Sequence, residues 1–302
     1  MNISEARDAS HSRLFQPLVA HAIAAQLIQA VAFIHSRGIV HADLHEANIL
    51  LRLPDCIDSL TPDQLYEKYG QPELEKITRW DGNPLDQWVP THGVIPVWFG
   101  DASDTISLAD SRIFLGDFSE SFQPTTDVRQ SSRTPFILRS PEILLEPTSH
   151  VSFPAEIWSL ACAVFAIMGQ RPLFETWFPD VDQVLQEHID TLGAFPSGLW
   201  VSWANQYQYF DDKLQRVHGS PRRLLEDRLE DSIQEPRKQY KMAEMDEEEK
   251  QAFLILLRSM LSFSPDDRPS AQQVLESNWM QKWAGPAFEL MKDNLSTSKT
   301  HR

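Results

Sequence analysis

The sequence contains only two cysteines, Cys56 and Cys162, which lie far apart in different surroundings. Disulfide frameworks and thiolate metal sites need several cysteines at characteristic spacings, so neither is predicted. Basic residues are also scarce, because 27 lysines and arginines stand against 43 aspartates and glutamates, giving a formal net charge of -16. This charge balance argues against direct nucleic-acid binding through phosphate contacts.

Long apolar runs are missing as well. The longest one, 157–168, is too short to span a bilayer and is interrupted by Ser159. Residues 1–16 are polar and mixed in charge, unlike a signal peptide. We therefore expect no membrane association and a cytoplasmic or nuclear location. Hydrophobic residues make up 42% of the 302 positions, which is enough to bury the core of one large domain.

Hydrophobic periodicity predicts a mainly α fold with a few short β-strands. The expected helices cover 17–38, Pro62–Tyr69, 156–168, Val181–Leu192 and 246–261. The expected strands are Ile49–Leu51 and 112–115. Prolines recur between 54 and 110, and this stretch is interpreted as an insertion within a single domain covering 1–302. Its tryptophans, Trp80, Trp88 and Trp98, are expected to anchor it on the body, and the polar tail is expected to fray from about 292.

The stretch HADLHEANIL, residues 41–50, places Asp43 and Asn48 in a short polar segment between apolar ones. Asp117 follows the second predicted strand, and two adjacent antiparallel strands would bring these loops together. Phosphoryl transfer needs an acceptor for the attacking hydroxyl's proton and oxygen ligands for a metal ion. Asp43 suits the first role, while Asn48 and Asp117 offer the hard oxygens that Mg²⁺ prefers. Taken singly, such loop residues are more often turn formers.

Five motifs in order make the sequence resemble the eukaryotic protein kinases. HADLHEAN resembles the catalytic loop H-R-D-L-x-x-x-x-N, and residues 117–119 resemble the metal-binding D-F-G. Residues 139–142 resemble the A-P-E region, 156–160 resemble the central-helix D-x-W-S, and 266–270 resemble D-x-R-P. The resemblance covers roughly residues 17–285 outside the insertion. It implies a protein-kinase-like C-terminal lobe.

The resemblance also implies site residues, with ATP and Mg²⁺ as cofactors. Asp43 would be the catalytic base, with His45 beside it at the position of a phosphate-contacting lysine. Asn48 and Asp117 would bind the metal, and Leu50 would line the adenine site. Glu142 is expected to form a buried ion pair with Arg268. Thr134, near the end of the activation segment, would shape the substrate-binding loop.

Within this family the chain looks closest to the SR-protein kinase-like branch. LRSPEILL, IWSLACAVFAIMGQRPLF and LGAFP are similar to that branch, whose kinase domain is also interrupted between the catalytic loop and D-F-G. The implied substrate is a protein Ser or Thr in a basic, Ser/Arg-rich context, which the acidic composition permits.

Several parts of the family pattern are missing. The chain has no G-x-G, and its first lysine, Lys68, follows the catalytic loop. We therefore expect a C-lobe without its N-lobe, a truncated or impaired enzyme with weak ATP binding, and a partner covering the face around Leu50 and Phe118. Ala42 replaces the arginine that reads activation-loop phosphorylation, and Glu156 replaces the aspartate that braces the catalytic loop.

Two other functions remain open. A kinase-like binding module without catalysis, a pseudokinase, would follow from the missing lysine and glycine-rich loop. His45 also makes HADLHEANIL similar to the H-G-D-L-H-x-x-N loop of small-molecule phosphotransferases of the aminoglycoside and choline kinase type. Those enzymes lack the three later motifs, which favours the protein kinase reading.

Overall fold

The computed structural model describes residues 1–53, 57–130, 132–146, 149–176, 179–219 and 221–300, with side chains described to residue 294. Cys56 therefore lies outside the described residues. The α-helices are α1 (Ile3–Asp8), α2 (Pro17–Ser36), α3 (Pro62–Tyr69), α4 (Pro141–Leu145), α5 (Phe153–Met168), α6 (Val181–Leu192), α7 (Ser197–Ser202), α8 (Gln206–Tyr209), α9 (Leu225–Leu229), α10 (Glu235–Gln239), α11 (Glu247–Met260), α12 (Ala271–Leu275) and α13 (Gly285–Thr300). The strands are β1 (Ile49–Leu51), β2 (Leu74–Lys76), β3 (His92–Val94) and β4 (Ile113–Leu115).

Short single turns complete the described elements. Five are 3₁₀ turns, at η1 (Glu46–Asn48), η2 (Ile57–Ser59), η3 (Phe118–Glu120), η4 (Phe136–Leu138) and η6 (Pro265–Asp267). Two are π-helical turns, η5 (Glu230–Gln234) and η7 (Met280–Ala284). The predicted mainly helical architecture with short strands is confirmed.

Helix α2 forms one side of the core. It begins at Pro17, where the missing N–H costs nothing, and ends just before Gly38, whose φ of 74° suits glycine. Among the described residues, α2 is the one helix long and apolar enough to cross a bilayer, but two-thirds of that stretch is buried. It packs against α5, α12 and α13, so its hydrophobicity is that of a core helix.

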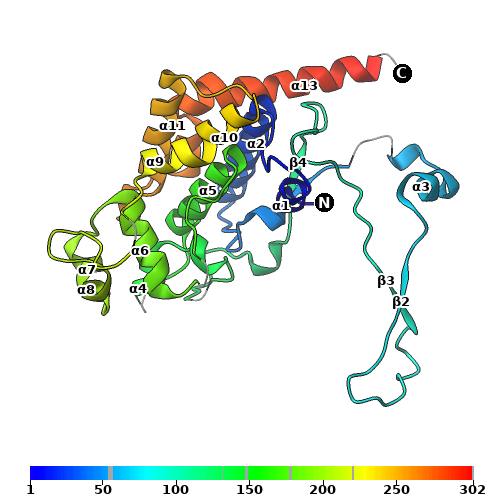
Figure 1. Ribbon diagram of the computed structural model, residues 1–302, viewed down its shortest axis with the longest axis horizontal. Coiled ribbons are helices and arrows are strands. Elements are labelled where there is room, and N and C mark those ends of the chain that lie inside the picture. Colours follow the sequence, from blue (N-terminus) through cyan, green and yellow to red (C-terminus); the bar gives the residue numbers. More distant parts are fainter. Residues whose placement is uncertain (54–56, 131, 147–148, 177–178, 220, 301–302) are drawn as a thin grey trace.

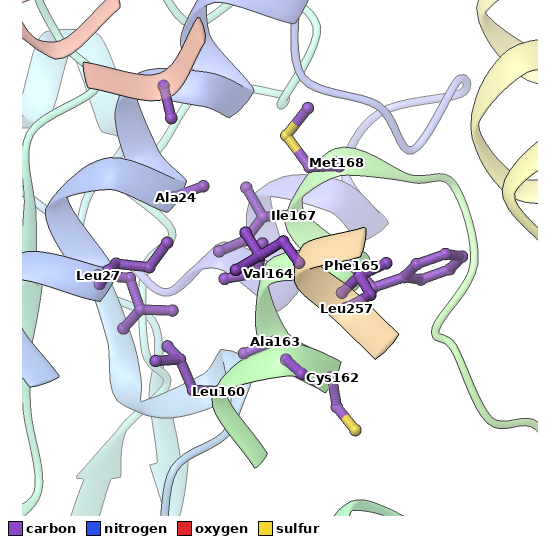
Figure 2. Close-up of a cluster of buried hydrophobic side chains, with 14 of the residues drawn as sticks. Ala24, Leu27, Leu160, Cys162, Ala163, Val164, Phe165, Ile167, Met168 and Leu257 are labelled. Atoms are coloured by element: carbon purple, nitrogen blue, oxygen red, sulfur yellow. The ribbon is translucent and has the colours of Figure 1, made fainter. Parts of the chain in front are cut away.

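Helix α5 runs through the centre of the body. Every residue from Ala155 to Met168 is buried, which explains why its sequence is apolar all round. Figure 2 shows Ala24 and Leu27 of α2 on one side of it and Leu257 of α11 on the other. The helix starts three residues earlier than its apolar run predicts, because the Ser152 side chain caps the Ala155 N–H.

Strands β1 and β4 form the small sheet that carries the predicted polar loops. They pair antiparallel, with Ile49 opposite Leu115 and Leu51 opposite Ile113. The predicted antiparallel neighbours are therefore confirmed, although about sixty residues separate them. The N-terminus adds to the same sheet, because Asn2 bridges Leu50 and the Leu51 N–H donates to the Met1 carbonyl.

The middle of the 54–110 segment forms an arm that extends away from the helical body and carries α3, β2 and β3 (Figure 1). The expectation that its tryptophans anchor it is wrong for two of them. Trp80 is fully exposed and Trp88 is 86% exposed. The chain rejoins the body near Ser103, which is fully buried and donates from Oγ to the Leu14 carbonyl.

The C-terminal half is helical and well capped. A capping box of Ser270 and Gln273 starts α12, because each side chain bonds the other residue's backbone N–H. Asp246 caps α11 through the Glu249 N–H. Although the polar composition predicts fraying from about 292, the backbone continues as α13 to Thr300.

Candidate active site

The loop between Val40 and β1 brings two predicted site residues into contact. The Asn48 amide Nδ2 donates to the Asp43 carbonyl at 2.9 Å and lies 3.3 Å from the Asp43 carboxylate Oδ2. The other carboxylate oxygen, Oδ1, is buried and has no hydrogen-bond partner among the described residues. An oxygen desolvated in this way is poised to accept a donor from a ligand.

His45 lies beside the same carboxylate. Its Nε2 is 3.6 Å from Asp43 Oδ1, while its Nδ1 accepts a hydrogen bond from the Ala47 N–H that starts turn η1. Both side chains are only partly exposed, at 21% for His45 and 16% for Asp43. Three of the sequence-predicted residues, Asp43, His45 and Asn48, are thus grouped by one short loop.

Asp117 reaches this loop through backbone contacts. The Gly116 N–H donates to the Asn48 carbonyl at 2.8 Å, and His41 Nε2 donates to the Gly116 carbonyl at 2.8 Å. Asp117 itself is left-handed, with φ of 57°, a conformation that aspartate tolerates better than most residues. The structure therefore places the end of β4 directly beside the start of β1.

The Asp117 carboxylate is exposed and ionised easily. Its Oδ1 accepts hydrogen bonds from the Ser119 hydroxyl at 2.6 Å and from the Ser119 N–H at 3.3 Å. These bonds, with smaller contributions from His41 and His45, lower the pKa of Asp117. A carboxylate kept anionic at neutral pH suits a cation ligand.

Glu156, on α5, braces the loop that carries Asp43. Its Oε2 accepts the Ala42 N–H at 2.8 Å, and its Oε1 lies 2.9 Å from His35 Nε2. Ala42 has a φ of 67°, an unfavourable conformation for alanine that this bond helps to hold. The extra methylene relative to aspartate therefore still allows the side chain to reach the loop.

The predicted pair between Glu142 and Arg268 is confirmed. Arg268 donates two parallel hydrogen bonds to the Glu142 carboxylate, both at 2.7 Å. Both side chains are buried, at 7% and 0% exposed. The Arg268 guanidinium also donates to the Pro154 and Ser262 carbonyls and stacks over Trp158.

The segment before α4 is fixed against the loop that carries Asp43. The Thr134 hydroxyl donates to the Ala42 carbonyl at 3.0 Å, and Arg139 Nε donates to the Thr134 carbonyl at 2.8 Å. Burial lowers the pKa of Arg139, and the nearby Asp43 opposes that shift. Thr134 is 5% exposed, so its hydroxyl serves this backbone contact.

An apolar face surrounds the candidate site on the β1–β4 side. Leu50 is 38% exposed, Phe118 is 43% exposed and Phe114 is 56% exposed. The Phe118 ring also meets His41 edge to face, with centroids 4.8 Å apart. Leu50 thus lies at the surface beside the polar loop, as a residue lining a ligand site would.

Sequence reasoning missed Arg7. This residue of α1 is 2% exposed and forms an ion pair with Glu46 of turn η1. Its guanidinium also donates to the Gln170 carbonyl at 2.8 Å and the Gly169 carbonyl at 3.3 Å, just beyond α5. The available signal was the capping box of Asn2 and Glu5, which marks the start of α1.

The residues present fit a magnesium ion better than they fit the phosphates of a nucleotide. No group of three His, Cys, Asp or Glu side chains capable of holding a metal occurs in the described part of the chain. The Asn48 amide and the Asp117 carboxylate nevertheless supply oxygen ligands of the kind that Mg²⁺ takes alongside substrate phosphates and water. No G-x-G and no lysine before Lys68 is present to hold those phosphates.

Comparison with known proteins identifies the family. The protein kinase domain model matches residues 106–280, more than half of the chain, a range that includes Asp117, Glu142 and Arg268. A serine/threonine protein kinase of Aspergillus fumigatus is 28% identical over 175 residues, covering 55% of this chain and 39% of the relative. Serine/threonine-protein kinase ICK of Mus musculus is 24% identical over 275 residues, covering 89% of this chain and 30% of the relative.

Cyclin-dependent kinase G-2 of Oryza sativa subsp. japonica is 22% identical over 274 residues, covering 85% of this chain and 26% of the relative. The chain thus spans between about a quarter and two-fifths of the length of these relatives. Since the family model matches more than half of its residues, the chain belongs to the protein kinase domain family.

Proposed function

We propose that this protein kinase domain takes part in transfer of the γ-phosphoryl group of ATP to a Ser or Thr hydroxyl of a protein. One observation carries the proposal. Asp43 and Asn48 are hydrogen-bonded in a loop braced by Glu156, and Asp117 stands one residue from the Gly116–Asn48 contact. Phosphoryl transfer depends mainly on positioning and charge stabilisation, which this arrangement supports.

Each site residue has a proposed role. Asp43 accepts the proton of the substrate hydroxyl, since its Oδ1 is desolvated and has no protein donor among the described residues. Asn48 and Asp117 hold magnesium, whose charge stabilises the phosphate oxygens. Leu50, half exposed beside the loop, contacts the adenine. His45 faces the reacting phosphate, at the position where the family pattern has a lysine.

Residues 1–302 alone are proposed to be catalytically impaired. The sequence contains no glycine-rich G-x-G, and no lysine precedes the catalytic loop. Positioning can lower a barrier by roughly 7–11 kcal/mol, and much of that requires a clamp on the phosphates. The second candidate, a kinase-like binding module without turnover, is favoured by the same absence.

The substrate and partners follow from charge and exposure. A substrate with a basic, Ser/Arg-rich context suits a chain of net charge -16. A partner protein is proposed to cover the apolar face of Leu50, Phe114 and Phe118, because exposed contiguous apolar residues mark interaction sites. A cytoplasmic or nuclear location remains part of the proposal. Membership in the protein kinase family disfavours the small-molecule phosphotransferase.

The test compares the native chain with Asp43→Asn. It measures the transfer of label from ATP radiolabelled at the γ-phosphate to a basic serine peptide in the presence of magnesium. Asp212→Asn, at an exposed position on the body, is the matched control. Turnover that Asp43→Asn abolishes and Asp212→Asn leaves intact supports the kinase. Absence of turnover in every variant, together with peptide binding, supports the binding module. Turnover that survives in Asp43→Asn contradicts the assigned base.

A further inference from the structure

The tip of the arm exposes two tryptophans. Trp80 and Trp88 lie in the connection between β2 and β3. Trp80 is fully exposed and Trp88 is 86% exposed. By contrast, Trp158, Trp203 and Trp279 of the body are at most 1% exposed. Fully exposed tryptophans are costly in water, so a pair of them on one loop marks an interaction site.

The loop that carries them is ordered by its own ion pairs. Arg79 donates to both carboxylate oxygens of Asp81, at 2.9 Å and 2.7 Å, and lies 3.8 Å from Asp86. The Arg79 hydrogen bonds hold the pKa of Asp81 well below its ordinary value. The Asn83 N–H also donates to Asp81. The tryptophans are therefore presented from a preorganised turn, which reduces the entropy lost on binding.

The rest of the arm exposes further apolar side chains. Leu74 and Val94 are paired across the β2–β3 ribbon and are each 63% exposed. Between α3 and the chain after β3 lies a groove of about 230 Å³, whose lining includes Tyr66, Tyr69 and Phe99. A two-stranded ribbon is marginal by itself, so a bound partner would stabilise the arm.

The charge of the arm selects the partner. Residues 57–100 carry seven acidic side chains and three basic ones, within a chain of net charge -16. A second copy would bring two acidic arms together, and an anionic lipid surface would be repelled. An arginine-bearing segment instead matches both features, because guanidinium groups pair with carboxylates and stack on indole rings.

We propose that the arm is a docking site for an arginine-containing cationic segment of a partner protein. Arginine side chains stack on Trp80 and Trp88, and the carboxylates of Glu73 and Glu75 on the ribbon attract the segment. The site is independent of phosphoryl transfer, since it lies on the arm rather than at the catalytic loop.

The experiment titrates the full chain with a peptide of six Arg-Gly repeats, followed by calorimetry and tryptophan fluorescence. The peptide has no hydroxyl, so it cannot be phosphorylated, and Asp43→Asn is expected to bind it as the native chain does. The double variant Trp80→Ala/Trp88→Ala should bind the Arg-Gly peptide with an affinity lower than that of the native chain by roughly fivefold or more. Tyr207→Ala, which removes a 62% exposed ring on the body, is the matched control and should not change the affinity.

Two further comparisons test the roles of arginine and of the carboxylates. A Lys-Gly peptide of equal charge should bind several-fold more weakly than the Arg-Gly peptide, and Glu73→Gln/Glu75→Gln should reduce the salt dependence of binding. Equal affinities of native chain and double tryptophan variant would overturn the proposal, as would failure of the Arg-Gly peptide to bind. If the native chain forms a concentration-dependent dimer and the double tryptophan variant does not, the arm binds a second copy of this chain, and the proposal of an arginine-containing partner is overturned.

Discussion

The Glu156 carboxylate accepts the Ala42 N–H at 2.8 Å and lies 2.9 Å from His35 Nε2, so one buried side chain joins α5, α2 and the loop that carries Asp43. Glutamate occupies a position where the family pattern has aspartate. Its carboxylate bonds the N–H of Ala42, which is left-handed with a φ of 67°. The loop that carries Asp43 is consequently tied to α5, in which every residue from Ala155 to Met168 is buried.

Glu156→Ala is expected to destabilise the fold by about 1–3 kcal/mol, because it leaves the buried Ala42 N–H unsatisfied. Urea unfolding followed by tryptophan fluorescence measures the change. Glu156→Gln keeps an acceptor for Ala42 and should cost less. If Glu156→Ala and the native chain have the same urea midpoint of unfolding, the contact between Glu156 and Ala42 contributes nothing to stability.

Arg268→Met is expected to cost about 3–5 kcal/mol, because it strands the Glu142 carboxylate in the interior. The double variant Glu142→Gln/Arg268→Met removes the stranded charge, and part of the lost stability should return. The measurement is again the urea midpoint. A double variant less stable than Arg268→Met alone would contradict an isolated buried pair.

The pH dependence of stability should report His188. This residue of α6 is fully buried against Trp158 and Phe174, and neither ring nitrogen has a hydrogen-bond partner among the residues described. Burial, reinforced by Arg268 and Arg228, lowers the pKa of His188 to about 3.

Because the folded pKa lies below the unfolded value near 6.5, the unfolded chain binds the proton first. Stability from this group is complete above pH 6.5 and falls below it by up to about 1.4 kcal/mol per pH unit. His188→Phe should flatten that slope between pH 6.5 and 4 while leaving the neutral-pH stability nearly unchanged. Parallel pH profiles for the two proteins would contradict this assignment.

Asp117→Asn is expected to weaken magnesium binding about tenfold, because it removes the one charged ligand proposed for the ion. Titration with magnesium alone, followed by calorimetry or by the NMR signals of the Asn48 amide, measures the effect. Asp212→Asn should bind magnesium as the native chain does. Unchanged affinity in Asp117→Asn would remove Asp117 from the metal site.

The sequence predicted the parts of the fold that are fixed by apolar periodicity and by paired motifs. α3 and α6 have the predicted bounds, and β1 pairs with β4 as expected. Glu142 and Arg268 are 126 residues apart, so only the motif order could join them. The roles of Asp43, His45, Asn48, Leu50 and Asp117 stay predictions.

The sequence did not reveal the elements whose stability is tertiary. Helix α1 is six residues long, below the length at which local propensity decides, and it is held by Arg7 and the Asn2–Leu50 bridge. The tryptophan content of the 54–110 segment predicted packing against the body, and that prediction failed for two residues. Tryptophan normally signals burial, but Trp80 and Trp88 face water, and no local pattern distinguishes an anchor from an exposed ring.

Arg7 has a practical consequence for any shortened form of the protein. A fragment that starts after residue 13 would lose the cation opposite Glu46 and leave the Gly169 and Gln170 carbonyls without its donors. The carboxylate would then stand uncompensated at the end of the segment that carries Asp43. The first dozen residues thus belong to the folding unit, and trimming them would loosen the loop that carries Asp43.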